Sequence, residues 1–339
     1  MICLRPIRQA DLPELEQIAK LSGPGFTSLP DDISALNAKI KHSIESFKRH
    51  VTDPKDECYL FALEDQHTGQ LIGTTGIIAK TGLGSPMYHL RQVKHALTCH
   101  DMALRNEFES LILTTDCSGA TEVCSLFLHP DYRVGKNGRF LSRSRFLFMA
   151  EQSQRFNSRV IAEMRGVSCA QGTSPFWDWM RERFTDIPFS ELTHRVGLGE
   201  TAFIPHIMPR HPLPLSCLSD DARAVVGTVH PDTEPAKKLL QKEGFCFRGC
   251  VDVFDAGPTL EAELSNIHTV VESRRTKVHI EHVKPGETLM VANCSHADFR
   301  ATFTEQAIFD KAQNTLLLSP VAADLLRVMN GDDVRICTL

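Results

Sequence analysis

The spacing of apolar and polar residues divides the first 80 residues into four elements. Residues 2–8 alternate as a strand does. Apolar residues three and four positions apart predict one helix whose start, Asp11–Glu14, has the arrangement of a capping box, and a second helix over Ile33–Phe47. The runs Tyr59–Glu64 and Leu71–Ile78, joined by a polar turn, predict a β-hairpin.

The middle of the chain carries a strand, a loop and a long helix in succession. The strand is predicted over Glu122–Leu128 and the helix over 138–156, where Phe and Leu side chains share one face that packs on a sheet. A short strand is predicted over Val160–Met164. Further along, Pro235–Glu243 predicts a short helix and Cys246–Phe254 predicts another strand.

Two regions depart from this order. Residues 81–119 show no clear period and are predicted to be an insertion that lines a pocket. After residue 265, short apolar runs alternate with turn residues, which predicts a small β-rich C-terminal domain over 266–339. The preceding residues, 1–265, are predicted to form one larger α+β domain, a mixed sheet flanked by helices.

Composition and charge exclude several classes of protein. The 339 residues include 37 Lys and Arg against 42 Asp and Glu, a net charge of −5, with no basic block, so no nucleic-acid partner is expected. No apolar run is long enough to cross a membrane, and the N-terminal residues resemble neither a secretory signal nor a transit peptide. The 11 cysteines and 15 histidines lack zinc-site spacing, which predicts reduced thiols, no bound metal and a cytoplasmic location.

One loop has the composition of an anion-binding site. It lies between the middle strand and the long helix, where backbone N–H groups and the helix dipole converge on a phosphate. Its candidate ligands are Arg133, Gly135, Lys136, Asn137 and Gly138. Their order resembles the pyrophosphate loop of the GCN5-related N-acyltransferase fold, which binds coenzyme A. An ordinary surface turn is the alternative.

Lys136 stands where that pattern has glycine. If the position requires a positive φ, a lysine there costs on the order of 1 kcal/mol of backbone strain. The other interpretation is a shifted register, with the ammonium beside a phosphate. Cofactor affinity is the property that this departure puts in question.

A second segment, His230–Phe245, resembles the last helix of the same fold, which runs beside the coenzyme A thiol. Many members of that fold carry a tyrosine there that protonates the departing thiolate, and this chain has Leu240 instead. His230 is the nearest titratable side chain. An imidazole, with an ordinary pKa of about 6.5, can accept a proton from an ammonium or return one to a thiolate. The alternative is that His230 only caps the helix that follows.

Longer collinear motifs make the resemblance specific. The segments similar to the arginine N-succinyltransferase family are Thr27–Pro30, Glu122–Arg133, Asn137–Phe146, Val160–Val167, Ser174–Trp177, Val226–Pro231 and Val251–Leu260. The similarity covers essentially the whole chain and is weakest after residue 266. Several long motifs in one order are a stronger signal than the phosphate loop alone.

The resemblance implies a GCN5-related N-acyltransferase-like fold and a defined reaction. The family transfers a succinyl group from succinyl-CoA to the α-amine of L-arginine in arginine catabolism, and some members accept ornithine. Succinyl-CoA is then a co-substrate, and no cofactor is permanently bound. The family's proton-transfer histidine falls on His230, and its succinyl-CoA contact in the strand before the loop falls on Leu126.

The predicted chemistry is direct attack of the amine on the thioester, because no cysteine stands beside an activating histidine. A backbone N–H near Leu126 would polarise the thioester oxygen while His230 relays the proton. Arginine also needs carboxylates for its guanidinium and donors for its own carboxylate. The candidates are Thr27, Ser28, Asp116, Glu122, Glu163 and Arg165, each also suited to a plainer role as surface charge or cap.

Two other functions stay open. One is a related N-acyltransferase with a different acyl group or a different amine, such as ornithine. The other is a non-catalytic, coenzyme A-binding subunit of a hetero-oligomer, which Lys136 favours. Retention of His230 and of the Asn137-Gly138 helix start favours an enzyme. A homodimer is the expected assembly, because two-fold symmetry is the commonest arrangement of soluble oligomers.

Overall fold

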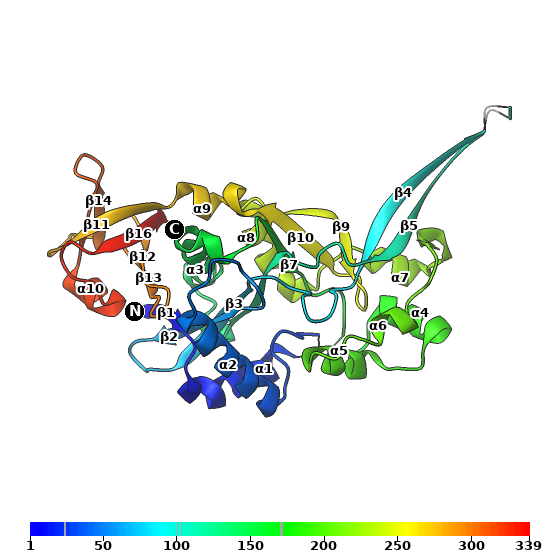
Figure 1. Cartoon of the computed structure of the whole chain (residues 1–339), viewed down its shortest axis with the longest axis horizontal. Coiled ribbons are helices and arrows are strands. Elements are labelled where there is room, and N and C mark those ends of the chain that lie inside the picture. Colours follow the sequence, from blue (N-terminus) through cyan, green and yellow to red (C-terminus); the bar gives the residue numbers. More distant parts are fainter. Residues whose placement is uncertain (24, 100, 103, 170–171) are drawn as a thin grey trace.

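The computed structural model describes residues 1–339 except 24, 100, 103 and 170–171. One continuous mixed sheet joins all its described strands, in the order β14-β15-β11-β16-β12-β13-β1-β2-β3-β6-β7-β10-β9-β4-β5-β8. Figure 1 shows the elongated shape that results, with helices α1 and α2 on one face of the central strands and α3, α8 and α9 on the other. The predicted α+β class, a mixed sheet flanked by helices, is therefore confirmed.

The N-terminal elements follow the apolar pattern closely. Strand β1 (Ile2–Pro6) leads to α1 (Leu12–Ser22) and α2 (Ile33–Lys48), whose buried stripes pack on the sheet. Strands β2 (Cys58–Asp65) and β3 (Leu71–Ile78) form the predicted antiparallel hairpin. Alternate residues of these strands face the two helical layers, which explains why both faces are apolar.

The capping box predicted at Asp11–Glu14 is not formed. The Asp11 carboxylate accepts instead from the guanidinium of Arg5, at 2.8 and 2.9 Å, and from the backbone N–H of Arg8 at 2.7 Å. Arg5 is only 4% exposed and also pairs with Glu64. A buried guanidinium needs counter-ions, and this need outweighs a helix cap.

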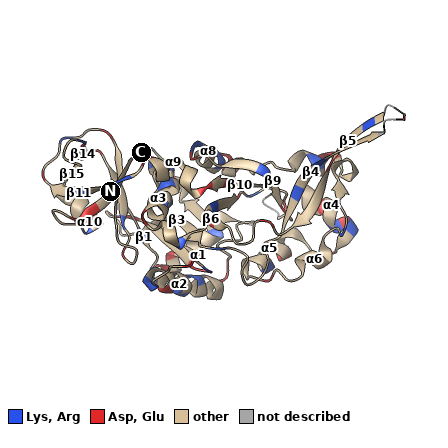
Figure 2. Cartoon of the chain, turned by 45° about the horizontal axis from the view of Figure 1, so that its top comes forward, with Lys and Arg blue, Asp and Glu red and all other residues tan. Residues whose placement is uncertain are grey.

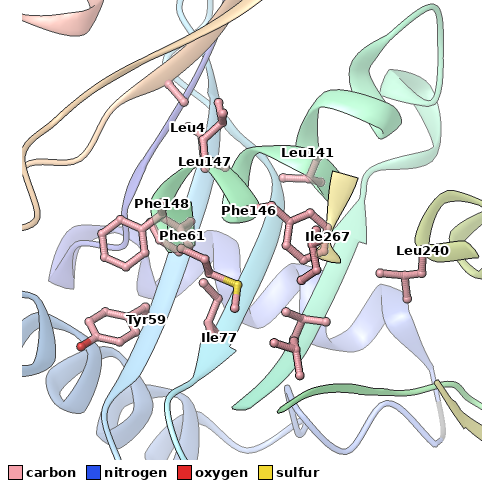
Figure 3. Packing of buried hydrophobic residues seen from close by; sticks show 14 of the residues in the cluster. Leu4, Tyr59, Phe61, Ile77, Leu141, Phe146, Leu147, Phe148, Leu240 and Ile267 are labelled. Carbon is pink, nitrogen blue, oxygen red and sulfur yellow. The ribbon is translucent and has the colours of Figure 1, made fainter. Parts of the chain in front are cut away.

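The centre of the sheet carries the strand–loop–helix unit. Strand β6 (Thr121–Leu128) runs antiparallel to β3 and is followed by the long helix α3 (Asn137–Glu151). Helix α3 buries Phe148 against Phe61 and Tyr59, with ring centroids 5.3 and 5.2 Å apart, as Figure 3 shows. This packing holds the start of α3 at the end of β6.

The second half of the central sheet begins at β7 (Arg159–Glu163). It continues through β10 (Pro258–Glu263) and β9 (Cys246–Asp252), while α8 (Glu234–Lys242) covers the same face as α3. The sequence predicted every one of these elements except β10, because Gly257-Pro258 reads as a break.

Residues 81–119 form a long hairpin, β4 (His89–Cys99) and β5 (Leu104–Thr114), that extends away from the body in Figure 1. Its base packs on four helices, α4 (Pro175–Phe184), α5 (Phe189–Gly197), α6 (Ile204–Ile207) and α7 (Asp220–Val225), with the two-residue strand β8 (Leu213–Pro214) at its edge. None of its described residues lines the main cavity described below, although His89 lies 2.8 Å from Glu163, which does, so the pocket-lining role stays a prediction.

The C-terminal strands extend the main sheet. They are β11 (Arg274–Ile280), β12 (Leu289–Asn293), β13 (Ala301–Thr304), β14 (Ala307–Asp310), β15 (Thr315–Leu318) and β16 (Asp333–Thr338), with helices α9 (His268–Glu272) and α10 (Pro320–Leu326). Leu4 of β1 pairs with Ala301 of β13, so one sheet crosses the predicted boundary at residue 265. The region also has its own apolar cluster, around Leu316 and Leu326. The two-domain division stays a prediction.

Charges are distributed along the whole chain. In the view of Figure 2, basic and acidic residues alternate over the helices and strands instead of gathering by sign on one element. Among the described residues, no helix is long and apolar enough to cross a membrane.

Candidate active site

The site begins where two neighbouring parallel strands separate. Strands β6 and β7 pair only at Thr121↔Val160 and Glu122↔Ile161. Beyond these pairs β6 continues to Leu128 while β7 ends at Glu163, and a cavity of about 270 Å³ opens between them. Helices α1 and α8 and the 252–255 turn complete its walls.

Strand β6 carries a bulge inside this cavity. Its register against β3 shifts between Thr74 and Gly76, and Ser125 adopts a φ of 52°, which is costly for a residue with a side chain. The hydroxyl of Thr74 donates to the Ser125 carbonyl at 2.9 Å and holds the bulge. Leu126 follows it, so the bulge reorients the backbone at the predicted acyl-CoA contact.

The cavity crosses the sheet and therefore has two chemically different ends. Glu122 and Cys124 face the side of α1 and α2, because they pair with Ile78 and Gly76 of β3. Val123 and Ala162 face the side of α3 and α8 and belong to the core there. An acceptor and an acyl donor entering from opposite faces would meet at the bulge.

The α1–α2 end is acidic. Burial, with repulsion from Glu163, raises the pKa of Glu122 to about 7, and burial followed by Glu163 also raises the pKa of Asp252. Nε2 of His89 lies 2.8 Å from Oε1 of Glu163, without hydrogen-bond alignment. Burial opposes the charged imidazole, but the Glu163 carboxylate outweighs it and raises the pKa of His89. Lys39 of α2 and His89 partly offset the charge of Glu122, but burial and Glu163 outweigh them, so an added cation at this end would be favoured.

Asp255 is a structural member of the same wall. It accepts from the backbone N–H groups of Gly166 at 2.7 Å and Gly257 at 2.8 Å, which ties the end of β7 to the turn before β10. A Cβ on Gly257 would lie 2.2 Å from the Met164 carbonyl oxygen, so only glycine permits this approach. Both oxygens of Asp255 are thereby committed to the fold.

His230 lies beside the cavity and is not one of its lining residues. Its backbone N–H donates to the Arg165 carbonyl at 2.9 Å, and its Nδ1 accepts from the Asp232 N–H at 3.2 Å. Arg165 and Asp232 both line the cavity. Burial, together with Arg165, lowers the pKa of His230, so the ring is neutral at pH 7. His230 thus caps the turn that follows it, which is the structural role considered above as the alternative. It also lies next to the cavity.

The phosphate loop lies at the opening on the α3 side. Gly135 takes the positive φ, at 57°, and Lys136 has an ordinary φ of −100°, so the register is shifted and the lysine is unstrained. The Lys136 ammonium bonds Thr288 and lies 3.6 Å from Glu305 of the C-terminal region. Arg133 donates to the Leu128 carbonyl at 2.9 Å and lines the cavity, while the Asn137 amide donates to the Tyr132 carbonyl at 3.1 Å.

A Gly135→Ala substitution should therefore weaken acyl-CoA binding without touching the amine site. The positive φ costs an alanine on the order of 1 kcal/mol, and the strain would move the loop, so we expect KM for succinyl-CoA to rise about fivefold. Steady-state kinetics against each substrate measure this. Gly84→Ala, at an unstrained glycine in open space, is the matched control. An unchanged KM would show that the loop does not hold the acyl donor.

Only some of the predicted site residues line the cavity. Those lining the cavity are Leu126, Arg133, Thr27, Ser28, Glu163 and Arg165, with Glu122 from the wider set. Gly135, Lys136, Asn137 and Gly138 form the loop at its opening, outside the lining. Asp116 lies elsewhere, paired with Arg91 at 2.9 Å. Whether any of them binds substrate remains a prediction.

Two further features bear on the chemistry. Cys124, predicted to be core, lines the cavity, but burial followed by repulsion from Glu122 raises its pKa to about 12, so it remains a thiol at neutral pH. Away from the cavity, ligand atoms of Cys117, Cys250 and Glu261 lie within 4.8 Å of one another, and Arg159 already pairs with Glu261 at 2.9 Å. The absence of a metal stays a prediction.

Sequence reasoning missed Arg145 and Asp252. Arg145 stands on α3 four residues after Leu141 and three before Phe148, inside the apolar stripe. A charged residue among the buried apolar positions of a helix is unusual, and it can be recognised from the sequence. Asp252 is the last residue of β9 and had no such signal.

Comparisons with known proteins agree with this geometry. The sequence model of the arginine N-succinyltransferase beta subunit matches residues 2–269, and that of its C-terminal domain matches residues 274–338. Arginine N-succinyltransferases of Citrobacter koseri and Yersinia pestis are 39% and 38% identical, each over 100% of this chain and 98% of the relative. The solved structure of the arginine/ornithine succinyltransferase subunit AI from Pseudomonas aeruginosa superposes with a TM-score of 0.91, at 33% identity, covering 100% of this chain and 98% of that one. The chain belongs to the arginine N-succinyltransferase family.

Proposed function

We propose that this protein transfers the succinyl group of succinyl-CoA to the α-amine of L-arginine, as the names of its relatives indicate for them. The observation that carries the proposal is the cavity between β6 and β7, which crosses the sheet and has an acidic end on one face and a phosphate loop on the other. A polyanionic acyl donor and a cationic amine are the partners that such an arrangement separates.

The acyl donor takes the α3 side. Its pyrophosphate lies at the start of α3, where Gly135 and the free N–H groups of the first turn face solvent, with Arg133 beside them. The thioester lies at the Ser125 bulge. The Leu126 backbone N–H then bonds the thioester oxygen and stabilises the oxyanion that forms there.

The amine takes the α1–α2 side. Glu122 and Glu163 bind the arginine guanidinium. Arg165 binds its carboxylate, because Arg165 lines the cavity and, within the described part of the chain, its side chain bonds only the Ser168 hydroxyl, at 3.2 and 3.3 Å. Thr27 and Ser28 lie on the same wall. Ornithine, with a shorter cationic side chain, fills the same site less completely.

The reaction forms one C–N bond and breaks one C–S bond. The neutral α-amine adds to the thioester carbon, His230 takes the proton from the resulting ammonium, and the imidazolium returns it to the departing thiolate. A lowered pKa keeps His230 unprotonated at pH 7 and able to accept. No covalent enzyme intermediate is needed, in keeping with the neutral Cys124 thiol.

A free-thiol release assay tests the reaction. We expect release from succinyl-CoA that depends on L-arginine, with the N-succinylarginine product confirmed by mass spectrometry. Ornithine, lysine and acetyl-CoA are the comparison substrates. Preference for ornithine or for another acyl group would identify a related N-acyltransferase. Coenzyme A binding with no release from any pair would contradict the proposal and indicate a non-catalytic subunit of a hetero-oligomer.

The proposal also includes a cellular location and an assembly. Succinyl-CoA and free arginine meet in the cytoplasm, where unpaired cysteines also persist. A homodimer is the expected assembly on symmetry grounds. Sedimentation velocity of the purified chain distinguishes it from a monomer that awaits a second subunit.

A further inference from the structure

Arg145 is a buried arginine without a carboxylate partner. It is 1% exposed, and its Nη1 donates to the Thr75 hydroxyl at 3.3 Å. Its Nε has no hydrogen-bond partner, and among the described residues no carboxylate oxygen lies within 4.0 Å of the guanidinium. A buried unpaired charge destabilises a fold, so such a residue calls for an anion that the protein chain itself does not supply.

Three other arginines that are buried or mostly buried have partners within the protein. Arg5 is paired with Asp11, and Arg143, two residues before Arg145 on α3, is paired with Glu243 at 2.9 Å. Arg155 donates to the Tyr59 hydroxyl at 3.1 Å and to the Arg49 carbonyl at 2.9 Å, although its Nε, like that of Arg145, has no hydrogen-bond partner among the described residues. Arg145 differs from all three because it also lines the cavity between β6 and β7.

The register places Arg145 level with the bulge, on the acyl-donor side. Leu141 packs over Gly73, which pairs with Leu128 near the end of β6. One helical turn later Arg145 reaches Thr75, the residue of β3 opposite the bulge. Thr75 pairs with Phe61, whose ring packs on Phe148 of α3, so this contact lies on the α3 face.

The order of residues along α3 gives the order of the parts of the proposed acyl-donor site. The phosphate loop is at the start of α3, and Arg145 follows two turns later, where its guanidinium bonds Thr75 opposite the bulge and lines the cavity together with Val123 and Met164. A thioester at the bulge would direct its acyl chain toward this guanidinium. An acyl group with a terminal carboxylate supplies the missing anion, and a neutral acyl chain does not.

We propose that Arg145 binds the distal carboxylate of the succinyl group and so determines the acyl specificity. This inference rests on the proposed function for the identity of the acyl donor. It assigns the acidic end of the cavity to the amine and the Arg145 guanidinium to the acyl tail, so that the two substrates are bound by groups of opposite charge on opposite faces of one sheet. Arg145 contacts substrate away from the reacting atoms.

The test compares succinyl-CoA with butyryl-CoA, which has the same four-carbon chain without the carboxylate. Isothermal titration calorimetry measures binding of each to the wild-type protein and to Arg145→Met, with no amine present. A charge-assisted hydrogen-bonded pair predicts that the substitution weakens succinyl-CoA binding roughly 10- to 150-fold and leaves butyryl-CoA unchanged or tighter. Kinetics with L-arginine should show the same change in the kcat/KM ratio of the two donors.

Arg155→Met is the matched control, since it removes a second buried guanidinium that does not line the cavity. It should change the melting temperature and leave the ratio of succinyl-CoA to butyryl-CoA affinity intact. Equal loss of both donors in Arg145→Met, or no loss of either, would overturn the assignment. If the wild-type protein binds succinyl-CoA but transfers nothing, the proposed function fails and the binding ratio still decides the role of Arg145.

Discussion

Replacing His230 by alanine should lower kcat for succinyl transfer by about a hundredfold or more, the scale of lost acid–base catalysis. His230 stands between Arg165 and Asp232 at the edge of the cavity. Its backbone N–H is bonded to the Arg165 carbonyl and its Nδ1 accepts from the Asp232 N–H, so the imidazole is held beside the place where the thiolate departs in the proposed reaction. Removing it leaves the ammonium and the thiolate without a shared proton carrier.

A cap and a catalyst predict different results for asparagine at this position. The Nδ1 of His230 accepts from the Asp232 N–H, a bond that an asparagine side chain also makes, because asparagine is among the best N-cap residues. His230→Asn should therefore keep the melting temperature near that of the wild type and lose kcat as severely as His230→Ala. Wild-type turnover in His230→Asn would leave His230 as a cap only.

The pH dependence of kcat gives a second, independent test of the role of His230. Burial and Arg165 lower the pKa of His230 below its ordinary value of about 6.5, so the neutral form persists to that pH and is lost below it. At saturating substrates, kcat should stay level above pH 6.5 and fall on acidification. The asparagine variant should lack this acid limb.

The sequence predicted most elements because their apolar periods were long and unbroken. The β2–β3 hairpin, α2 and α3 each bury a regular face and appear within one or two residues of their predicted bounds, apart from the end of α3. The long helix ends at Glu151 instead of 156, where a 3-10 turn over Ser153–Arg155 takes over. Strand β10 was not predicted, because Gly257-Pro258 is typical of a break between elements. The strand begins at Pro258 and lies between β7 and β9 in the sheet.

The site was harder to predict because its walls come from distant segments. Glu122, Glu163 and Asp252 stand on β6, β7 and β9, and only the sheet order brings them together. Asp116 had the same composition signal as Glu122 and lies outside the cavity, since Arg91 pairs with it at the base of the hairpin. Local sequence therefore identifies candidate carboxylates but does not select among them.

Lys136 shows how a resemblance can mislead at one position. The family pattern suggested either strain or a phosphate contact there. The positive φ moved to Gly135, and the lysine side chain reaches Thr288 and Glu305, which are more than 150 positions along the chain. Its ammonium therefore joins the loop to the C-terminal strands, a contact that no local pattern could disclose. The departure consequently gives no support to a non-catalytic role.

The second large effect is expected at Glu122. In the proposed site, the guanidinium of arginine pairs with the Glu122 carboxylate, which is 8% exposed. Losing one partner of such a buried pair costs about 2–5 kcal/mol, so Glu122→Gln should lower kcat/KM for arginine roughly 30- to several thousand-fold. KM for succinyl-CoA should not change, because that substrate lies on the other face. Asp116→Asn, at an exposed carboxylate outside the cavity, is the control and should behave as the wild type.

The pKa of Glu122, raised to about 7 by burial and Glu163, gives this prediction a distinctive pH dependence. Below pH 7 the carboxyl is protonated and cannot pair with the guanidinium, so the Kd for arginine should be about tenfold weaker at pH 6 than at pH 8, with proton release on binding at pH 6. In Glu122→Gln the same titration should be flat. A wild-type Kd that is independent of pH would place the guanidinium elsewhere.

Stability should change in the opposite direction to activity. Because the folded-state pKa of Glu122 is raised, the folded state is disfavoured as pH rises from the unfolded-state value toward 7, when the carboxyl must ionise while buried beside Glu163. Glutamine has no such ionisation. The melting temperature of Glu122→Gln should therefore exceed that of the wild type at pH 8 and match it near pH 5, while saturating arginine should stabilise the wild type far more than the variant. A variant destabilised at both pH values would mean that Glu122 serves the fold instead of the amine, since Lys39 and His89 would then stabilise its charge sufficiently without substrate.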